Sequence, residues 1–152
     1  MSIQTRLTEL EITLPQAAAP VASYVPVVVA NNIAHVSGQL PFMQGELVTG
    51  RMGEGASIEE GAAAARACGL MILAQLEAAL IPLDRVARIV KLGAFVNSTA
   101  DFIDQPKVAN GASDLMVSIF GAKGKHARSA VGVPTLPLGA LVEVDAIVCL
   151  TP

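Results

Sequence analysis

The chain has 152 residues, of which 53% are hydrophobic, 15% are charged and 3% are aromatic, and its formal net charge is -3. A chain of this length is expected to fold as one domain, with a core built mainly from Ala, Val, Leu and Ile. The negative net charge comes without a Lys/Arg cluster, so the composition argues against nucleic acid as a partner.

The sequence also argues against a membrane or secreted protein. Residues 1–11 carry charges and lack the apolar centre of a signal peptide, and no window approaches the run of about 18 apolar residues that a membrane span needs. Cys68 and Cys149 lack metal-ligand spacing and are interpreted as buried thiols in a reducing compartment. We therefore expect a cytoplasmic protein without a metal site. A surface with so few charges further predicts a homo-oligomer with buried subunit interfaces.

The N-terminal residues 1–20 are predicted to form an arm outside a single core domain of residues 21–150. Within the arm, residues 14–20 place three successive alanines between two prolines, a composition typical of an extended segment.

The core is predicted to begin with a β-hairpin. Strands are expected over residues 24–29 and 33–37, and Asn31 and Asn32 between them tolerate the positive φ angles of a tight turn. A glycine-rich loop follows Pro41, and residues 47–49 are expected to add a short strand within it.

A long helix is predicted next. Ser57-Ile-Glu-Glu60 has the S-x-x-E form of a capping box, small and apolar residues follow at i+3/i+4 spacing as far as Leu80, and Pro82 ends the run. The remaining elements are a strand over 86–96, a turn over 97–101, a helix with Pro106 in its first turn that extends to about residue 120, a strand over 129–133, a turn over 134–139 and a strand over 140–150. This order predicts an α+β domain with helices on one face of a sheet.

The polar residues that suggest chemistry lie near the last two strands. Glu143 would share a strand face with Asp145, so it either lies on a solvated face or lines a cleft. Arg128 directly precedes a strand and is either a surface arginine or the fork that binds a carboxylate with two parallel hydrogen bonds. The pattern alone leaves both choices open.

Three blocks resemble one known family. The stretch Ala127-Arg-Ser-Ala-Val-Gly-Val-Pro-Thr-Leu-Pro-Leu-Gly-Ala-Leu-Val-Glu-Val-Asp145 is similar to the signature of the Rid family, also called the YjgF/UK114 or "endoribonuclease L-PSP" family. The spacing of fifteen positions between Arg128 and Glu143 fits that signature. His35-Val-Ser-Gly-Gln-Leu-Pro41 and the Tyr24-Val25 strand start match further blocks, and the likeness covers residues 21–150 of a chain that resembles the longer branch of the family.

The resemblance implies a chorismate-mutase-like α+β fold, with two helices packed on one face of a mixed sheet, and a homotrimer with clefts between neighbouring subunits. It implies that Arg128 holds a substrate carboxylate and that Glu143 positions or activates the attacking water. Many relatives have a cysteine where this chain has Ala130. The further substrate-binding residues implied are Tyr24, Ser37, Gly38, Asn110, Ser129 and Ala130.

The function implied by the resemblance is that of a cofactor-free enamine/imine deaminase. It would hydrolyse small amino-acid-derived 2-imino acids, such as the tautomer of 2-aminoacrylate, to 2-keto acids and ammonia, without a metal. The alternative is a non-catalytic trimer that binds a keto acid or related carboxylate as a metabolite sensor. A third hypothesis, an endoribonuclease, fits poorly with a net charge of -3.

Overall fold

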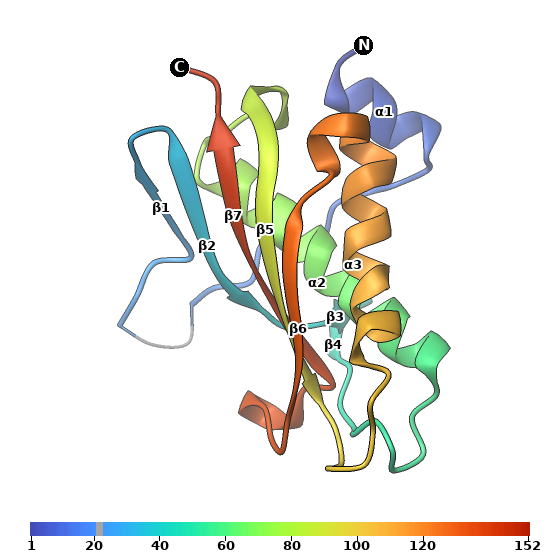
Figure 1. Ribbon diagram of the computed structural model, residues 1–152. Helices are drawn as coiled ribbons and strands as arrows, with labels where there is room; N and C mark the ends of the chain where they lie inside the picture. Colours follow the sequence, from blue (N-terminus) through green and yellow to red (C-terminus); the bar gives the residue numbers. More distant parts are fainter. Residues whose placement is uncertain (21–22) are drawn as a thin grey trace.

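The computed structural model describes residues 1–20 and 23–152 (Figure 1). The α-helices are α1 (Ile3–Glu9), α2 (Ile58–Ala78) and α3 (Gln105–Phe120), and short 3-10 helices are η1 (Leu83–Arg85), η2 (Gly121–Gly124) and η3 (Pro137–Gly139). The strands are β1 (Val27–Ala30), β2 (Ile33–Gln39), β3 (Phe42–Met43), β4 (Glu46–Leu47), β5 (Val86–Asn97), β6 (Ala127–Val133) and β7 (Val142–Leu150). Within the described residues, no helix has the length and apolar character needed to cross a bilayer.

Five strands form one mixed sheet in the order β1-β2-β7-β5-β6, and β3 pairs with β4 in a separate small hairpin. The β5–β6 pair is parallel and is connected through α3, whereas the other pairs are antiparallel. Figure 1 shows α2 and α3 side by side on one face of this sheet. The predicted α+β architecture is therefore confirmed, although the prediction of two helices missed α1.

The first hairpin has the predicted turn but a shorter first strand. Asn31 and Asn32 have φ angles of 50° and 60°, the values that a tight two-residue turn requires. The strand begins at Val27, so the prediction that it starts at Tyr24 is wrong. Pro26 explains the difference, because it has no backbone N–H for the ladder.

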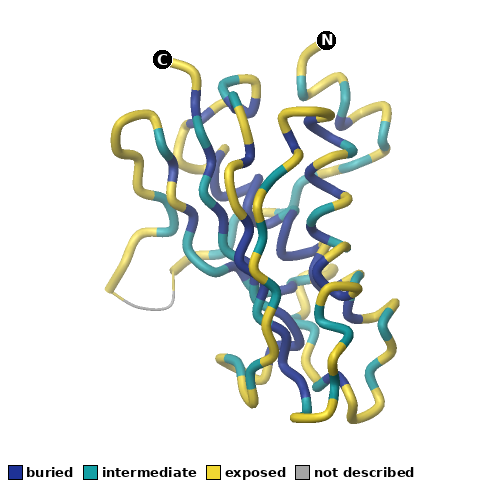
Figure 2. The backbone as a smooth tube through the Cα atoms, viewed as in Figure 1, coloured by how far each residue is buried: buried dark blue, intermediate teal, exposed yellow. Residues whose placement is uncertain are grey.

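The core lies between the sheet and the two long helices. Along β7 every second residue from Val142 to Leu150 is buried, and Figure 2 shows the same burial in the helix segments that face the sheet. The capping box of α2 is present, with the backbone N–H of Ser57 2.7 Å from Glu60 Oε2 and that of Glu60 3.1 Å from Ser57 Oγ. Small residues then let α3 approach α2 so closely that a Cβ at Gly111 would overlap the Ala62 carbonyl.

In the part of the chain that the structure describes, no α-helix covers the other face of the sheet (Figure 1). We call it the open sheet face. It contains a shallow hollow of about 480 Å³ and mixes apolar with polar side chains. The residues on it include His35, Lys91, Phe95, Ser129, Val131, Asp145 and Ile147.

The N-terminal arm is part of the folded domain, so the prediction of an appendage is wrong for residues 1–12. Ser2 caps α1, and Leu7 on this helix is only 2% exposed within the main core. The backbone N–H of Ile3 bonds to Asp84, and the Arg6 side chain donates to the Ser118 carbonyl at 3.0 Å. After α1 the chain runs extended along α2, as predicted for residues 14–20.

Replacing Leu7 by alanine should lower the free energy of unfolding by about 2–5 kcal/mol, because it leaves a cavity in the core. Urea denaturation measures this change. Gln4→Ala, at an exposed position of the same helix, is the control and should change stability by less than about 0.5 kcal/mol. A small effect from both substitutions would show that α1 is not part of the cooperative core.

Candidate active site

Glu143 is the acidic centre of the candidate site. It lies on β7 between the buried Val142 and Val144, so its side chain points to the open sheet face. It lines a pocket of about 140 Å³ at the end of β2, which we call the Glu143 pocket. The other residues that line it are Ala18, Ala19, Pro20, Tyr24, Pro26, Gly38, Gln39, Leu40, Phe42, Gln75, Pro137 and Leu138.

Gly38 makes room for the glutamate. The register between β2 and β7 shifts between Val36 and Gln39, and Gly38 lies within this irregularity. A Cβ at Gly38 would overlap the Glu143 carboxylate. The glycine therefore allows the backbone to approach the carboxylate closely, which any side chain would prevent.

Burial changes the acidity of Glu143. The half-buried carboxyl has its pKa raised above the ordinary value, first by desolvation and second by the negative charge of Asp145. Glu143 forms no hydrogen bond or ion pair with any side chain or backbone group that the structure describes, and Asp145 is held by the Gly93 N–H at 3.0 Å. A carboxylate with a raised pKa and free oxygens can accept a proton from water.

Tyr24 lines the Glu143 pocket, and Ser37 holds the segment that carries it. The Ser37 hydroxyl lies 3.0 Å from the Pro26 carbonyl and 3.2 Å from that of Val25, to which it can donate. These contacts tie the segment that carries Tyr24 to β2. Tyr24 is 46% exposed at the wall of the Glu143 pocket, where its hydroxyl has no described partner. Ser37 therefore has a structural role that the sequence did not indicate.

Arg128 forms a second cluster, on the face of the sheet that α3 covers. Its Nη1 donates to Asn110 Oδ1 at 2.8 Å and to Ser113 Oγ at 3.1 Å, and its Nη2 donates to the Pro106 carbonyl at 3.4 Å. These three acceptors are all neutral. A guanidinium has five N–H donors, so one on Nε and one on Nη2 have no acceptor among the described residues. Arg128 is thus held in place with its positive charge uncompensated.

Ser113 and His126 support this arrangement. His126 Nδ1 donates to the Gly124 carbonyl at 2.6 Å, which in the neutral ring leaves Nε2 as an acceptor for the Ser113 hydroxyl at 2.8 Å. The Ser113 oxygen in turn accepts from Arg128. Sequence reasoning missed both residues. The available signal was the i, i+3 spacing of Asn110 and Ser113, which places them on one face of a helix.

The structure does not bring all predicted site residues together within one chain. Tyr24 and Gly38 line the pocket with Glu143, whereas Asn110 lies with Arg128 on the opposite face of the sheet. Ser37 does not line this pocket and contacts the Val25 and Pro26 carbonyls instead. Two other predicted residues divide between the faces: Ala130 packs towards the core on the face of Arg128, and Ser129 lies on the open sheet face. One chain therefore carries two separate halves of the predicted site.

Neither cysteine belongs to these two groups. Cys68 is buried against the Val142 carbonyl, and burial raises the pKa of its thiol well above the ordinary value, with a smaller contribution from Glu143. Cys149 is only half-buried, so the prediction of two buried thiols is wrong for this residue. The cause is strand alternation, because Cys149 has the same parity as Glu143 and faces the open side of β7.

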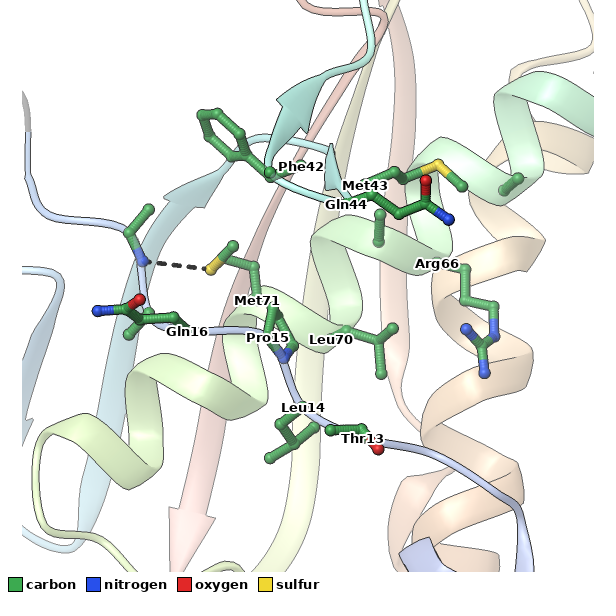
Figure 3. Close-up of a pocket in the computed structure, with 15 residues that line it drawn as sticks. Thr13, Leu14, Pro15, Gln16, Phe42, Met43, Gln44, Arg66, Leu70 and Met71 are labelled. Atoms are coloured by element: carbon green, nitrogen blue, oxygen red, sulfur yellow. Dashed lines mark hydrogen bonds between the residues drawn. The ribbon is translucent and has the colours of Figure 1, made fainter.

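A hollow larger than the Glu143 pocket lies elsewhere. It is a groove of about 710 Å³ between the arm, α2 and the β3–β4 hairpin, and we call it the arm groove (Figure 3). Its lining is mainly apolar, with Arg66 as the charged residue, and it contains no acidic side chain or histidine. We assign the candidate site to the smaller Glu143 pocket, because a perturbed carboxyl in a cavity is a stronger indicator of chemistry than volume.

The fold is a YjgF/chorismate-mutase-like α+β fold with a mixed sheet and three α-helices, and residues 4–150 match the family model described as "YjgF/chorismate mutase-like, putative endoribonuclease". The chain belongs to this family, as the sequence blocks predicted. It is 53% identical over 148 residues to "Protein TCP17" of Trypanosoma cruzi, covering 96% of this chain and 92% of that protein.

Two solved structures share this fold over nearly the whole chain. The protein Atu1372 of Agrobacterium tumefaciens, described as of unknown function, is 44% identical, with a TM-score of 0.90 over 98% of this chain and 92% of that chain. A protein of Shewanella oneidensis, described as "a putative endoribonuclease", is 34% identical, with a TM-score of 0.94 over 99% of this chain and 100% of that chain.

Replacing Ser113 by alanine should weaken the binding of a small anion at Arg128 by about tenfold, since a lost hydrogen bond to a charged group changes affinity by about 1.5 kcal/mol. Calorimetric titration with pyruvate measures the change. Ser118→Ala, on the same helix but away from Arg128, is the control. Equal affinities for both variants would show that Ser113 does not orient the guanidinium.

Proposed function

We propose that the protein is a cofactor-free deaminase that hydrolyses small 2-imino acids and their enamine tautomers to 2-keto acids and ammonia. The observation that supports this proposal is that the Arg128 guanidinium is held by neutral groups alone. Its side chain is fixed by Asn110, Ser113 and a backbone carbonyl, all neutral, so its charge is available for a substrate carboxylate. The second requirement is a base, and Glu143 has the free oxygens and raised pKa that suit this role.

We further propose that the two halves meet between subunits of a homotrimer. Arg128 and Glu143 lie on opposite faces of one sheet, so no side-chain rotation within a chain brings them together. β6 is an edge strand with one side of its backbone unpaired, and the neighbouring open sheet face exposes Val131 and part of Phe95 and Ile147. Both features favour association with other copies, which would place the edge strand of one subunit beside the Glu143 pocket of the next.

The chemistry follows from this arrangement. Arg128 holds the substrate carboxylate, and Glu143 takes a proton from a water molecule as the water oxygen attacks the imine carbon. The electrons of the C=N bond move to nitrogen, which receives from Glu143 the proton taken from water. The hydroxyl proton of the resulting aminoalcohol then passes to the amino group, ammonia leaves, and the hydroxyl oxygen becomes the keto oxygen. An enamine first gains a proton at carbon to give the imine. Overall, imino acid and water give keto acid and ammonia.

The rate enhancement required is modest, since such imines already hydrolyse in water. A general base contributes about 10²- to 10⁴-fold, and fixing the substrate by its carboxylate adds to this. The same arginine would also serve a protein that only binds keto acids. That second function differs from the first in having no role for Glu143 as a base.

Glu143→Gln should lower the rate of imine hydrolysis by about 10²- to 10⁴-fold, because the amide cannot accept a proton, while pyruvate still binds at Arg128. An amino-acid oxidase that supplies the imine, with keto-acid release followed over the uncatalysed rate, provides the measurement. Glu46→Gln, an exposed glutamate on β4, is the control. Binding of pyruvate without turnover in the unaltered protein would instead support the sensor.

The pH dependence of imine hydrolysis should report the protonation of Glu143. Since its pKa is raised, activity should fall with acidification at a pH above about 4.3, the pKa of an unperturbed glutamate. Asp145→Asn removes the nearby negative charge and should move this acidic limb to lower pH, as a pH profile of kcat/KM would show.

The raised pKa of Glu143 also affects the stability of the domain. Because the folded state holds this proton more tightly than the unfolded state, the free energy of unfolding falls as the pH rises from the unperturbed pKa through the raised one. Glu143→Gln should therefore be at least as stable as the unaltered protein at neutral pH, and a less stable variant would indicate a structural role.

A further inference from the structure

The end of the N-terminal arm forms one wall of the Glu143 pocket. Ala18, Ala19 and Pro20 line this pocket together with Glu143, whereas the preceding arm residues line the arm groove. Ala18 and Phe42 border both hollows, and Figure 3 shows the arm passing over α2 beside Phe42. The arm therefore reaches the candidate active site although it lies far from Glu143 in the sequence.

A buried hydrogen-bond network holds the arm at this place. Gln75 on α2 is only 4% exposed, and its amide donates to the Ala18 carbonyl at 2.7 Å and to Gln39 Oε1 at 3.1 Å. Gln39 is also buried and donates to the Ser37 carbonyl at 3.0 Å. On its other side, the Ala18 N–H meets the Met71 sulfur at 3.4 Å, the contact drawn in Figure 3. The network links the arm to the strand that carries Ser37 and Gly38.

The opposite wall contains an unusual leucine. Leu138 is 67% exposed and has a φ angle of 60°, a conformation that side chains other than Gly, Asn and Asp rarely adopt. It is held there by the tight turn in which the Gly139 N–H bonds to Leu136 and the Ala140 N–H bonds to Pro137. An exposed, large apolar side chain in this conformation is typical of a functional site, and Leu138 lines the Glu143 pocket.

We propose that the arm end, Phe42 and Leu138 form an apolar subsite that receives the side chain of the 2-imino acid. The proposal rests on the proposed function and names its substrate class: imino acids with uncharged aliphatic side chains. Among the described side chains that line the Glu143 pocket, only Glu143 carries a charge, and the amides of Gln39 and Gln75 already bond within the protein. With Arg128 of the neighbouring subunit engaged by the substrate's own carboxylate, an acidic substrate side chain would find no second cation among these described side chains and would be repelled by Glu143.

The volume of the pocket sets an upper size. It measures about 140 Å³, and a cavity of about 150 Å³ is known to hold benzene. Because the same space must also hold the reacting carbon and the attacking water beside Glu143, only side chains of a few carbon atoms fit. The arm end therefore acts as a specificity-determining wall and not as a catalytic element.

The test compares two alanines of the arm. Ala19 lines the Glu143 pocket, and Ala17, two positions earlier, lines only the arm groove. Ala19→Leu should lower the hydrolysis rate of the imine from norleucine by at least about tenfold relative to that from alanine, because a few methylene groups change selectivity by such factors. Ala17→Leu is the matched control and should leave the ratio unchanged. The imines are generated by an amino-acid oxidase, and keto-acid release is followed for alanine, norleucine and glutamate.

A second variant removes the opposite wall. Leu138→Gly keeps the backbone conformation, since glycine adopts positive φ freely, so the melting temperature should not fall. The norleucine-to-alanine rate ratio should decrease, because the longer side chain loses its apolar contact. If Ala19→Leu and Ala17→Leu change all substrates equally, or if the glutamate-derived imine is the best substrate, the subsite does not exist while the proposed function stands.

Failure of the proposed function gives a different result, namely no turnover of any imine by the unaltered protein. The subsite is then judged by calorimetric binding of 2-oxopropanoate and 2-oxohexanoate. A selective loss of the longer acid in Ala19→Leu supports it, and equal binding of both acids to both arm variants overturns it.

Discussion

The alternation of side chains along β7 is the constraint on which the rest of this structure depends. β7 lies at the centre of the sheet, paired with β2 on one side and β5 on the other, so its register cannot shift without disrupting both ladders. With Val142 and Val144 in the core, Glu143 must face the open side. The desolvation that raises its pKa, its neighbour Asp145 and its separation from Arg128 all follow from this placement.

The two groups of polar residues differ in how they are held, and the difference suits their proposed roles. Arg128 is fixed by three neutral oxygens, all from residues of α3, which orient the guanidinium without neutralising it. Glu143 lacks such partners and is placed by its strand and by the space that Gly38 leaves. A rigid cation and a carboxyl with free oxygens are what carboxylate binding and water activation respectively require.

The N-terminal arm contributes both to the stability of the domain and to the shape of the Glu143 pocket. Its first part is anchored by Leu7 in the core and by contacts to α3 and η1, and its last part is fixed by the Gln75 amide. Because buried amides are stable only when hydrogen-bonded, the position of Ala18 is closely defined. The pocket wall is therefore an integral part of the fold, although it is built from the residues nearest the N-terminus.

The sequence by itself determined the elements whose signals are local: the Asn31-Asn32 turn, the capping box at Ser57 and the order of strands and helices from α2 onward. It also nominated Arg128 and Glu143 as candidate site residues, through a resemblance to a motif in which both stand at fixed spacing. Only the tertiary structure decided which face each side chain occupies, that α1 joins the core, and that Ser113, His126 and the arm end support the two halves. The physical reason is that these features come from contacts between segments far apart in the chain. Such contacts depend on how helices and strands pack, and no local periodicity encodes them.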